Sequence, residues 1–92
     1  MIKVGTLTLD TSRGEAYRHG ELVAHLTRAE LLIFVTLWKA GRPLSPGALS
    51  QRTSITHASI RAHVRNIREK LGHDIILTRR GWYGYELIKE NA

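Results

Sequence analysis

Residues 57–72 read HASIRAHVRNIREKLG, a pattern typical of an amphipathic α-helix. Four apolar side chains recur in it at helical spacing, so they form one narrow stripe along an α-helix. We predict a helix from His57 to Leu71 that ends at Gly72, with the stripe in a hydrophobic core and the opposite face in solvent. The stripe consists of Ile60, Val64, Ile67 and Leu71.

The face opposite the stripe carries side chains that can read the edges of DNA bases. Arginine and asparagine form paired hydrogen bonds with guanine and adenine in the major groove, and a small alanine can contact the methyl group of thymine. An ordinary surface helix is the alternative, because Arg65 and Glu69 lie one turn apart and can form an ion pair there. The residues that we expect at base edges are Ala62, Arg65, Asn66 and Glu69, and those expected at a phosphate strand are Arg61 and Arg68.

Two further helices are predicted upstream. Thr27 and Glu30 have the spacing of a capping box, in which each side chain satisfies a free backbone amide of the other at a helix start. This helix runs to about Ala40, and its apolar residues cover nearly its whole circumference, so we expect it to be buried on several sides. A second, short helix begins with Ser45 as its N-cap and Pro46 as its first residue.

Short strands flank the helices. The first 26 residues alternate apolar and polar side chains between turn signals, with a slip in phase at Gly5-Thr6, which predicts a small antiparallel sheet with a bulge or a break. Residues 74–78 and 85–88 are strand-like runs around a tip that is rich in arginine and aromatic residues. The predicted class is α+β, a winged helix-turn-helix. One domain (1–92) then holds an N-terminal antiparallel β-sheet (1–26), a three-helix core (27–72) and a C-terminal β-hairpin wing (74–88).

Basic residues gather around the third helix and the hairpin. The chain has 14 Lys and Arg against 8 Asp and Glu, which gives a net charge of +6. Residues 57–80 hold six of the basic residues and two of the acidic ones, so this window carries +4 of the total. Such clustering is typical of proteins that bind a polyanion, and a solvated basic surface is the alternative.

The hairpin tip adds to the case for DNA. Arg79 and Arg80 are adjacent and precede Gly81, so an arginine can extend from the tip into a narrow minor groove, where the negative potential is concentrated. Trp82 or Tyr83 can pack on the sugar-phosphate backbone. The alternative is a turn with two solvated arginines and with its aromatic side chains in the core.

The sequence gives little support for other classes of function. The absence of cysteine excludes disulfides and thiolate metal sites, and His57, His63 and His73 share no ligand face, so we expect no metal ion and no cofactor. We expect no enzyme activity, because a nucleophile elbow and a glycine-rich phosphate loop are both missing. No apolar run approaches the roughly 20 residues of a membrane span, and the start is not a signal peptide, so the cytoplasm is the expected location.

Four stretches, in this order and over nearly the whole chain, resemble the DNA-binding (effector) domain of the OmpR/PhoB class of bacterial response regulators. LTRAELL at residues 26–32 is similar to the family's L-T-x-x-E, and Leu44-Ser45 with Leu49 to its V-S-x-x-x-L. Residues 59–72 are similar to its T-V-D-V-H-I-x-x-L-R-x-K-L-G. Thr78, with RG at 80–81 and GYEL at 84–87, is similar to its T-V-R-G-x-G-Y-x-L.

The resemblance implies sequence-specific binding of double-stranded DNA by a transcription regulator, with two copies head to tail on a direct repeat. It implies a four-stranded sheet ahead of the winged helix, with the third helix in the major groove and the wing in the minor groove. The two lines of argument differ only for His63: the resemblance places it near the DNA backbone, whereas its position on the helix predicts a half-buried side chain that packs against the protein. The implied contacts are Ala62, Arg65 and Asn66 in the major groove, Ser59, His63 and Arg68 near the backbone, and Arg80 in the minor groove.

Departures from the family pattern bear on specificity and partners. Ala58 stands where the family often has arginine, and Arg61 where it often has aspartate, so we expect an unusual DNA sequence to be read. Residues 52–57 are fewer than in the family's usual loop, which often touches RNA polymerase, so that partner stays open. No receiver domain or phosphorylatable aspartate site is present in the 92 residues. The chain is then either the effector half of a longer regulator or a stand-alone protein. The alternative function is a winged helix that binds protein or RNA.

Overall fold

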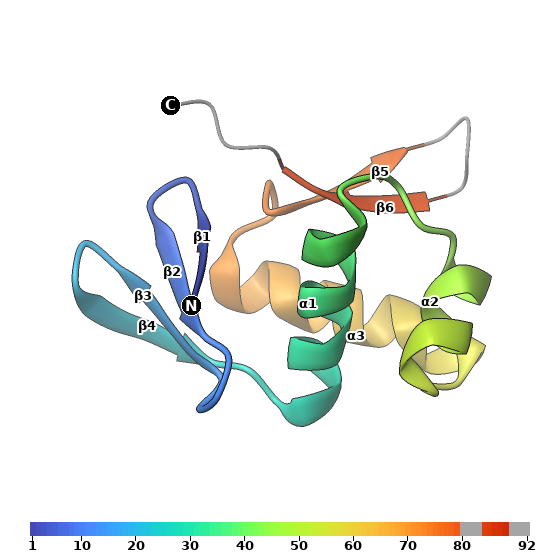
Figure 1. Ribbon diagram of the computed structural model, residues 1–92, viewed down its shortest axis with the longest axis horizontal. Coiled ribbons are helices and arrows are strands. Elements are labelled where there is room, and N and C mark those ends of the chain that lie inside the picture. Colours follow the sequence, from blue (N-terminus) through green and yellow to red (C-terminus); the bar gives the residue numbers. More distant parts are fainter. Residues whose placement is uncertain (80–83, 89–92) are drawn as a thin grey trace.

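Helices and strands follow one another in the predicted order (Figure 1). The structure, a computed structural model, describes residues 1–79 and 84–88. Within these residues the strands form a four-stranded sheet of order β1-β2-β3-β4 and a two-stranded hairpin, β5-β6, both antiparallel. The predicted α+β winged helix-turn-helix is confirmed. The elements are β1 (Ile2–Val4), β2 (Leu7–Asp10), β3 (Glu15–Arg18), β4 (Glu21–His25), α1 (Arg28–Ala40), α2 (Pro46–Thr53), α3 (His57–Leu71), β5 (Ile76–Arg79) and β6 (Gly84–Leu87).

Helix α1 stands between the N-terminal sheet and α2 (Figure 1), and the predicted capping box fixes its first turn. Thr27 Oγ1 accepts a hydrogen bond from the Glu30 amide at 3.2 Å, and Glu30 Oε1 accepts one from the Thr27 amide at 2.9 Å. The helix is buried on several sides, as expected, but two of its apolar residues remain partly exposed. Leu32 and Trp38 are 39% and 46% exposed, because α2, α3 and β6 pack against the other sides.

Helix α2 begins where the sequence predicts, and helix α3 both begins and ends there. Ser45 Oγ accepts a hydrogen bond from the Ala48 amide at 3.0 Å, and Pro46 is the first residue of α2. Helix α3 runs from beside α2 to the N-terminal sheet (Figure 1), and its apolar stripe is fully buried. The stripe therefore points into the core, and the basic face of α3 points away from it.

The slip in phase near the N-terminus is a strand break. Val4 pairs with Leu7 across the Gly5-Thr6 turn, in which Gly5 has a φ of 60°. This left-handed conformation costs glycine little, because glycine has no Cβ. The irregularity of register in the sheet lies instead between Ala16 and Tyr17, where β3 pairs with β4.

Strand β6 is paired on both of its sides. It pairs with β5, and its other edge forms a bridge with Leu44 in the connection between α1 and α2. The Tyr85 amide donates to the Leu44 carbonyl oxygen at 2.8 Å, and the Leu44 amide donates to the Tyr85 carbonyl oxygen at 2.9 Å. A Cβ at Gly84 would lie 3.2 Å from both the Leu44 oxygen and the Pro43 Cβ, so glycine permits this close approach.

Candidate nucleic-acid interface

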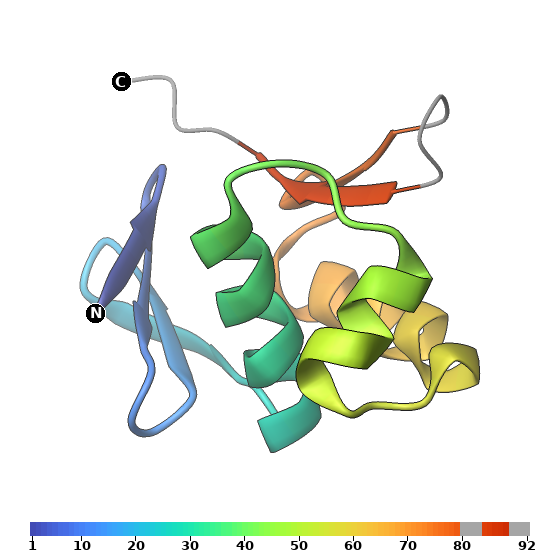
Figure 2. The same cartoon turned by 45° about the vertical axis from the view of Figure 1, so that its right-hand side comes forward.

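A basic groove lies between α3 and the wing. Four elements line it: α2 through its first residue, α3 through one flank, and the two strands of the hairpin, β5 and β6. Figure 2 shows the hairpin lying above α2 and α3 on the same side of the molecule. Of the described residues that line the groove, three are arginines and none is acidic, so its electrostatic potential is positive. The lining residues are Pro46, Ala58, Arg61, Ala62, Arg65, Arg68, Thr78, Gly84 and Tyr85.

The structure brings together some of the predicted contact residues and separates others. Four of them, Arg61, Ala62, Arg65 and Arg68, line the groove, and the first three are exposed. Glu69 is exposed but is not part of the groove lining. The remaining predicted residues of α3 lie on its other flank and are half-buried. They are Ser59, His63 and Asn66.

His63 packs as its place on the helix predicts. Its side chain is half-buried, and its Nδ1 atom is buried without a hydrogen-bond partner among the described residues. Ser59 is engaged at the start of α3, because its Oγ accepts a hydrogen bond from Thr56 Oγ1 at 2.8 Å. Neither residue lines the basic groove.

Arg68 is bound to the wing. Its Nε and Nη2 atoms both donate to the Ile76 carbonyl oxygen, at 3.0 and 2.6 Å, and Nη2 also donates to Thr78 Oγ1 at 2.9 Å. The guanidinium carbon lies 5.8 Å from the centre of the Tyr85 ring, within the range of a cation–π contact. The sequence places Arg68 on the flank of α3 that lines the groove but gives no sign of these partners.

Arg79, the first of the two adjacent wing arginines, is paired. Its Nε donates to Glu86 Oε1 at 2.8 Å, and the Glu86 side chain is only 10% exposed. The two strands lie one or two residues from their predicted limits, 74–78 and 85–88, so Arg79 belongs to β5. The other predicted contacts of the wing, Arg80 and Tyr83, lie outside the described residues.

The end of α3 is anchored to the N-terminal half of the chain. Lys70 Nζ donates to Glu30 Oε1 at 2.7 Å and to the His25 carbonyl oxygen at 2.9 Å, and Arg18 donates to the Leu71 carbonyl oxygen. Burial alone would raise the pKa of Glu30, but the hydrogen bonds from Lys70 and Thr27 hold that pKa below its ordinary value. Glu30 is therefore ionised near neutral pH, and it neutralises a lysine that the composition counts toward the basic cluster.

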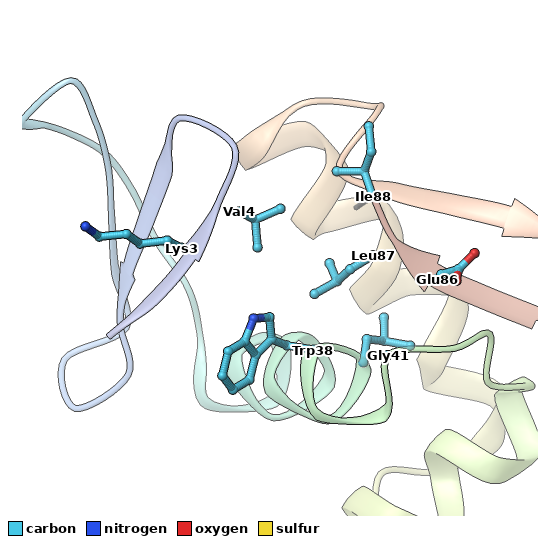
Figure 3. A pocket seen from close by; sticks show the side chains of 8 residues that line it. Lys3, Val4, Trp38, Gly41, Glu86, Leu87 and Ile88 are labelled. Atoms are coloured by element: carbon cyan, nitrogen blue, oxygen red, sulfur yellow. The ribbon is translucent and has the colours of Figure 1, made fainter. Parts of the chain in front are cut away.

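A second, apolar groove lies between β1, the end of α1 and β6 (Figure 3). The side chains of Val4, Trp38 and Leu87 line it, with Lys3 and Glu86 as its only charged lining residues among those described. Lys3 and Glu86 do not form an ion pair with each other, and Glu86 is held by Arg79. The groove therefore lacks the convergent polar groups of a catalytic site.

The described part of the chain has neither a metal cluster nor a membrane-spanning helix. Residues 1–79 and 84–88 hold no group of three or more His, Cys, Asp or Glu side chains that could bind a metal ion. None of the described helices combines the length and the apolar character that crossing a membrane requires.

The whole fold is shared with solved structures, although no family model and no curated protein matches the sequence. The DNA-binding domain of CpxR from E. coli is 30% identical, with a TM-score of 0.75 over 98% of this chain and 97% of that one. The DNA-binding domain of the response regulator AdeR, solved in complex with an intercistronic region, is 23% identical (TM-score 0.73, 97% of this chain and 98% of that one). The DNA-binding domain of CadC from E. coli is 19% identical, with a TM-score of 0.81 over 95% of this chain and 90% of that one. The last two likenesses concern the fold alone.

Proposed function

Because the chain belongs to the winged-helix DNA-binding domains of OmpR/PhoB-type response regulators, we propose that it binds double-stranded DNA sequence-specifically and regulates transcription. One observation carries the proposal: the solvent-exposed flank of α3 and the wing form a groove lined by three arginines and by no acidic side chain among the described residues. A groove of this charge attracts the phosphate backbone. The AdeR domain, solved with an intercistronic region, is a precedent for this fold on DNA.

In the proposed complex, α3 lies in the major groove and the wing in the adjacent minor groove. The exposed position of Arg65 in the basic groove supports a contact with a guanine edge, and Ala62 beside it suits a thymine methyl group. Arg61 is aimed at a phosphate strand. The further contacts that we propose are Asn66 and Glu69 at base edges, Ser59 and His63 near the backbone, Arg80 in the minor groove, and Tyr83 on the sugar-phosphate backbone. Arg68 and Arg79, which the sequence also assigns to DNA, are held by Thr78 and Glu86, so we propose that they act chiefly through the wing.

We extend the proposal to the assembly and its setting. Two copies bind head to tail on a direct repeat, as in the family that the sequence resembles, and they act in the cytoplasm without catalysis. RNA polymerase is the proposed protein partner, although the short segment between α2 and α3 (residues 54–56) leaves little surface for it there. The head-to-tail assembly and the polymerase contact are inferred from the family.

Selection of bound duplexes from a random pool tests the proposal. We expect enrichment of a short motif and an affinity that falls steeply with salt, because each phosphate neutralised adds roughly 0.9 to the slope of log K against log salt. The matched control is the double variant Arg61→Glu, Arg65→Glu, which reverses two exposed charges of the groove and should bind no duplex. Absence of enrichment, together with salt-insensitive capture of protein or RNA, would instead support the interaction module.

A further inference from the structure

We propose that Arg68 is a positioning residue that fixes the wing relative to α3, so that it contributes to DNA binding through the wing. The inference rests on the proposed function for its effect on DNA. Its structural basis stands apart from DNA, in the contacts of Arg68 with both strands of the hairpin. Arg68 thereby differs from Arg61, which lies on the same flank of α3 and is exposed.

The contact with β5 is made to the backbone. Two nitrogen atoms of the Arg68 guanidinium donate to the carbonyl oxygen of Ile76, whose side chain is buried in the core. A planar guanidinium that donates two hydrogen bonds to one atom is held in direction as well as in distance. The acceptor cannot rotate away as a side chain could, so the position of β5 is tied to that of Arg68.

The same guanidinium reaches farther along the hairpin and across it. Nη2 donates to Thr78 Oγ1, and the Tyr85 ring lies beside the guanidinium on the other strand. Thr78 and Tyr85 face each other in the β5-β6 register, so Arg68 contacts both members of one cross-strand pair. This pair lies next to Arg79 and Gly84, the described residues on either side of the tip, so Arg68 constrains the outer part of the two strands.

Among the described residues, the hydrogen bonds between side chains of α3 and the hairpin are all donated by Arg68. The root of the hairpin is held separately, by the burial of Ile76 and Leu87 and by the hydrogen bond from the Ile88 amide to the Ile75 carbonyl oxygen. Loss of the Arg68 side chain should therefore leave the root in place and release the outer part of the wing.

The first measurement uses two duplexes that share the major-groove site. One extends past it on the wing side and the other stops short of the wing. We expect Arg68→Ala to lower affinity at least about tenfold on the long duplex and less than about threefold on the short one. Arg61→Ala, the matched control, should cost the same factor on both. Equal losses for Arg68→Ala on both duplexes would overturn the proposal.

Two variants separate position from charge. Arg68→Lys keeps the positive charge but cannot donate two hydrogen bonds to one carbonyl oxygen from a planar group. It should therefore lose affinity for the long duplex nearly as Arg68→Ala does. Restoration of wild-type affinity by lysine would identify a simple phosphate contact and overturn the positioning role.

Hydrogen exchange of the protein without DNA tests the structural step alone. In Arg68→Ala the backbone amides that pair β5 with β6 near Thr78 should exchange faster, whereas those of the middle of α3 should not change. Arg61→Ala should leave both sets unchanged. Unaltered exchange in the hairpin would overturn the proposal. If no variant and no wild-type protein binds any duplex, the proposed function fails, and the exchange result still decides the role of Arg68.

Discussion

The two halves of α3 carry the same kind of side chain but hold it in different ways. In the C-terminal half, Arg68 and Lys70 donate hydrogen bonds to the wing and to the start of α1. In the N-terminal half, Arg61 and Arg65 are exposed and make no ion pair or side-chain hydrogen bond with another described residue. The number of basic residues therefore overstates the positive charge available to a polyanion, since some of the cations bind other parts of the protein.

The largest expected effect concerns the C-terminal half of α3, whose cations are hydrogen-bonded to other parts of the protein. Glu30→Ala removes the counter-ion of Lys70 and one hydrogen bond of the capping box, so we expect a loss of about 3 kcal/mol in the free energy of unfolding, measured by urea denaturation. Arg65→Ala, in the N-terminal half of α3 where the arginines are exposed (the free half), is the control and should change that free energy by less than about 0.5 kcal/mol. Equal stability of the two variants would remove the distinction between the halves.

The same ion pair predicts a dependence of stability on pH. The folded pKa of Glu30 is lower than its unfolded pKa, so its contribution is fully present above the ordinary value of 4.5 and is lost as the pH falls through the folded pKa. Glu30→Gln removes this titrating carboxylate. Between neutral pH and strongly acidic pH, the wild type should therefore lose more stability than Glu30→Gln. Parallel curves for the two proteins would argue against an ionised Glu30 in the fold.

The next effect concerns the free half, where we expect sequence preference to reside. Arg65→Ala or Asn66→Ala should cost roughly 1–3 kcal/mol on the preferred site and relax the preference at the base that it contacts. Arg61→Ala should weaken good and poor sites alike. Competition assays on the selected site and its single-base variants measure both. Uniform losses for all three variants would show that the residues of α3 that contact the bases are assigned wrongly.

A smaller effect is expected at the wing tip. Narrow A·T-rich minor grooves attract arginine, so Arg80→Ala should lower affinity more on a site with an A·T-rich flank than on one with a G·C-rich flank. Wild type and variant on the two duplexes give four affinities. Equal losses would make Arg80 a phosphate contact, and no loss on either duplex would mean that it does not touch DNA.

The smallest effect concerns Arg79, whose charge is compensated by Glu86. Glu86→Gln should release Arg79 and steepen the slope of log K against log salt by up to about 0.9, the contribution of one phosphate contact. Arg79→Ala in the wild-type background should change the slope little. A decrease in slope for Arg79→Ala would show that Arg79 already contacts DNA despite its partner.

What the sequence predicts well in this protein is local. The capping box of α1, the N-cap of α2 and the apolar stripe of α3 depend on residues within one or two turns, and the structure confirms all three. The partners of the cations depend on where distant segments come to lie. Lys70 and Glu30 are 40 residues apart, and Arg68 and Thr78 are 10 apart, so spacing could not reveal either contact.

The exposure of two apolar residues of α1 could not be predicted for a similar reason. Trp38 and Leu32 fit a helix that is buried on several sides, and only the placement of the neighbouring elements shows which parts of its surface stay open. The groove itself is an intermediate case. The flank with Arg61 and Arg65 follows from helical periodicity, but its closure by the wing requires the hairpin to lie against Arg68.

The bridge between Leu44 and Tyr85 sets the unit that protein engineering would have to move. A wing taken from another domain would lose its neighbour on the β6 side unless residues 43–44 came with it, and a Cβ at position 84 would lie only 3.2 Å from that neighbour, which would have to shift. Because Ser45 caps α2 directly after this bridge, the graft would also have to preserve the start of that helix. The smallest exchangeable module of this domain therefore consists of two pieces of chain, the hairpin and the connection before α2, that are about 30 residues apart in sequence and hydrogen-bonded in space.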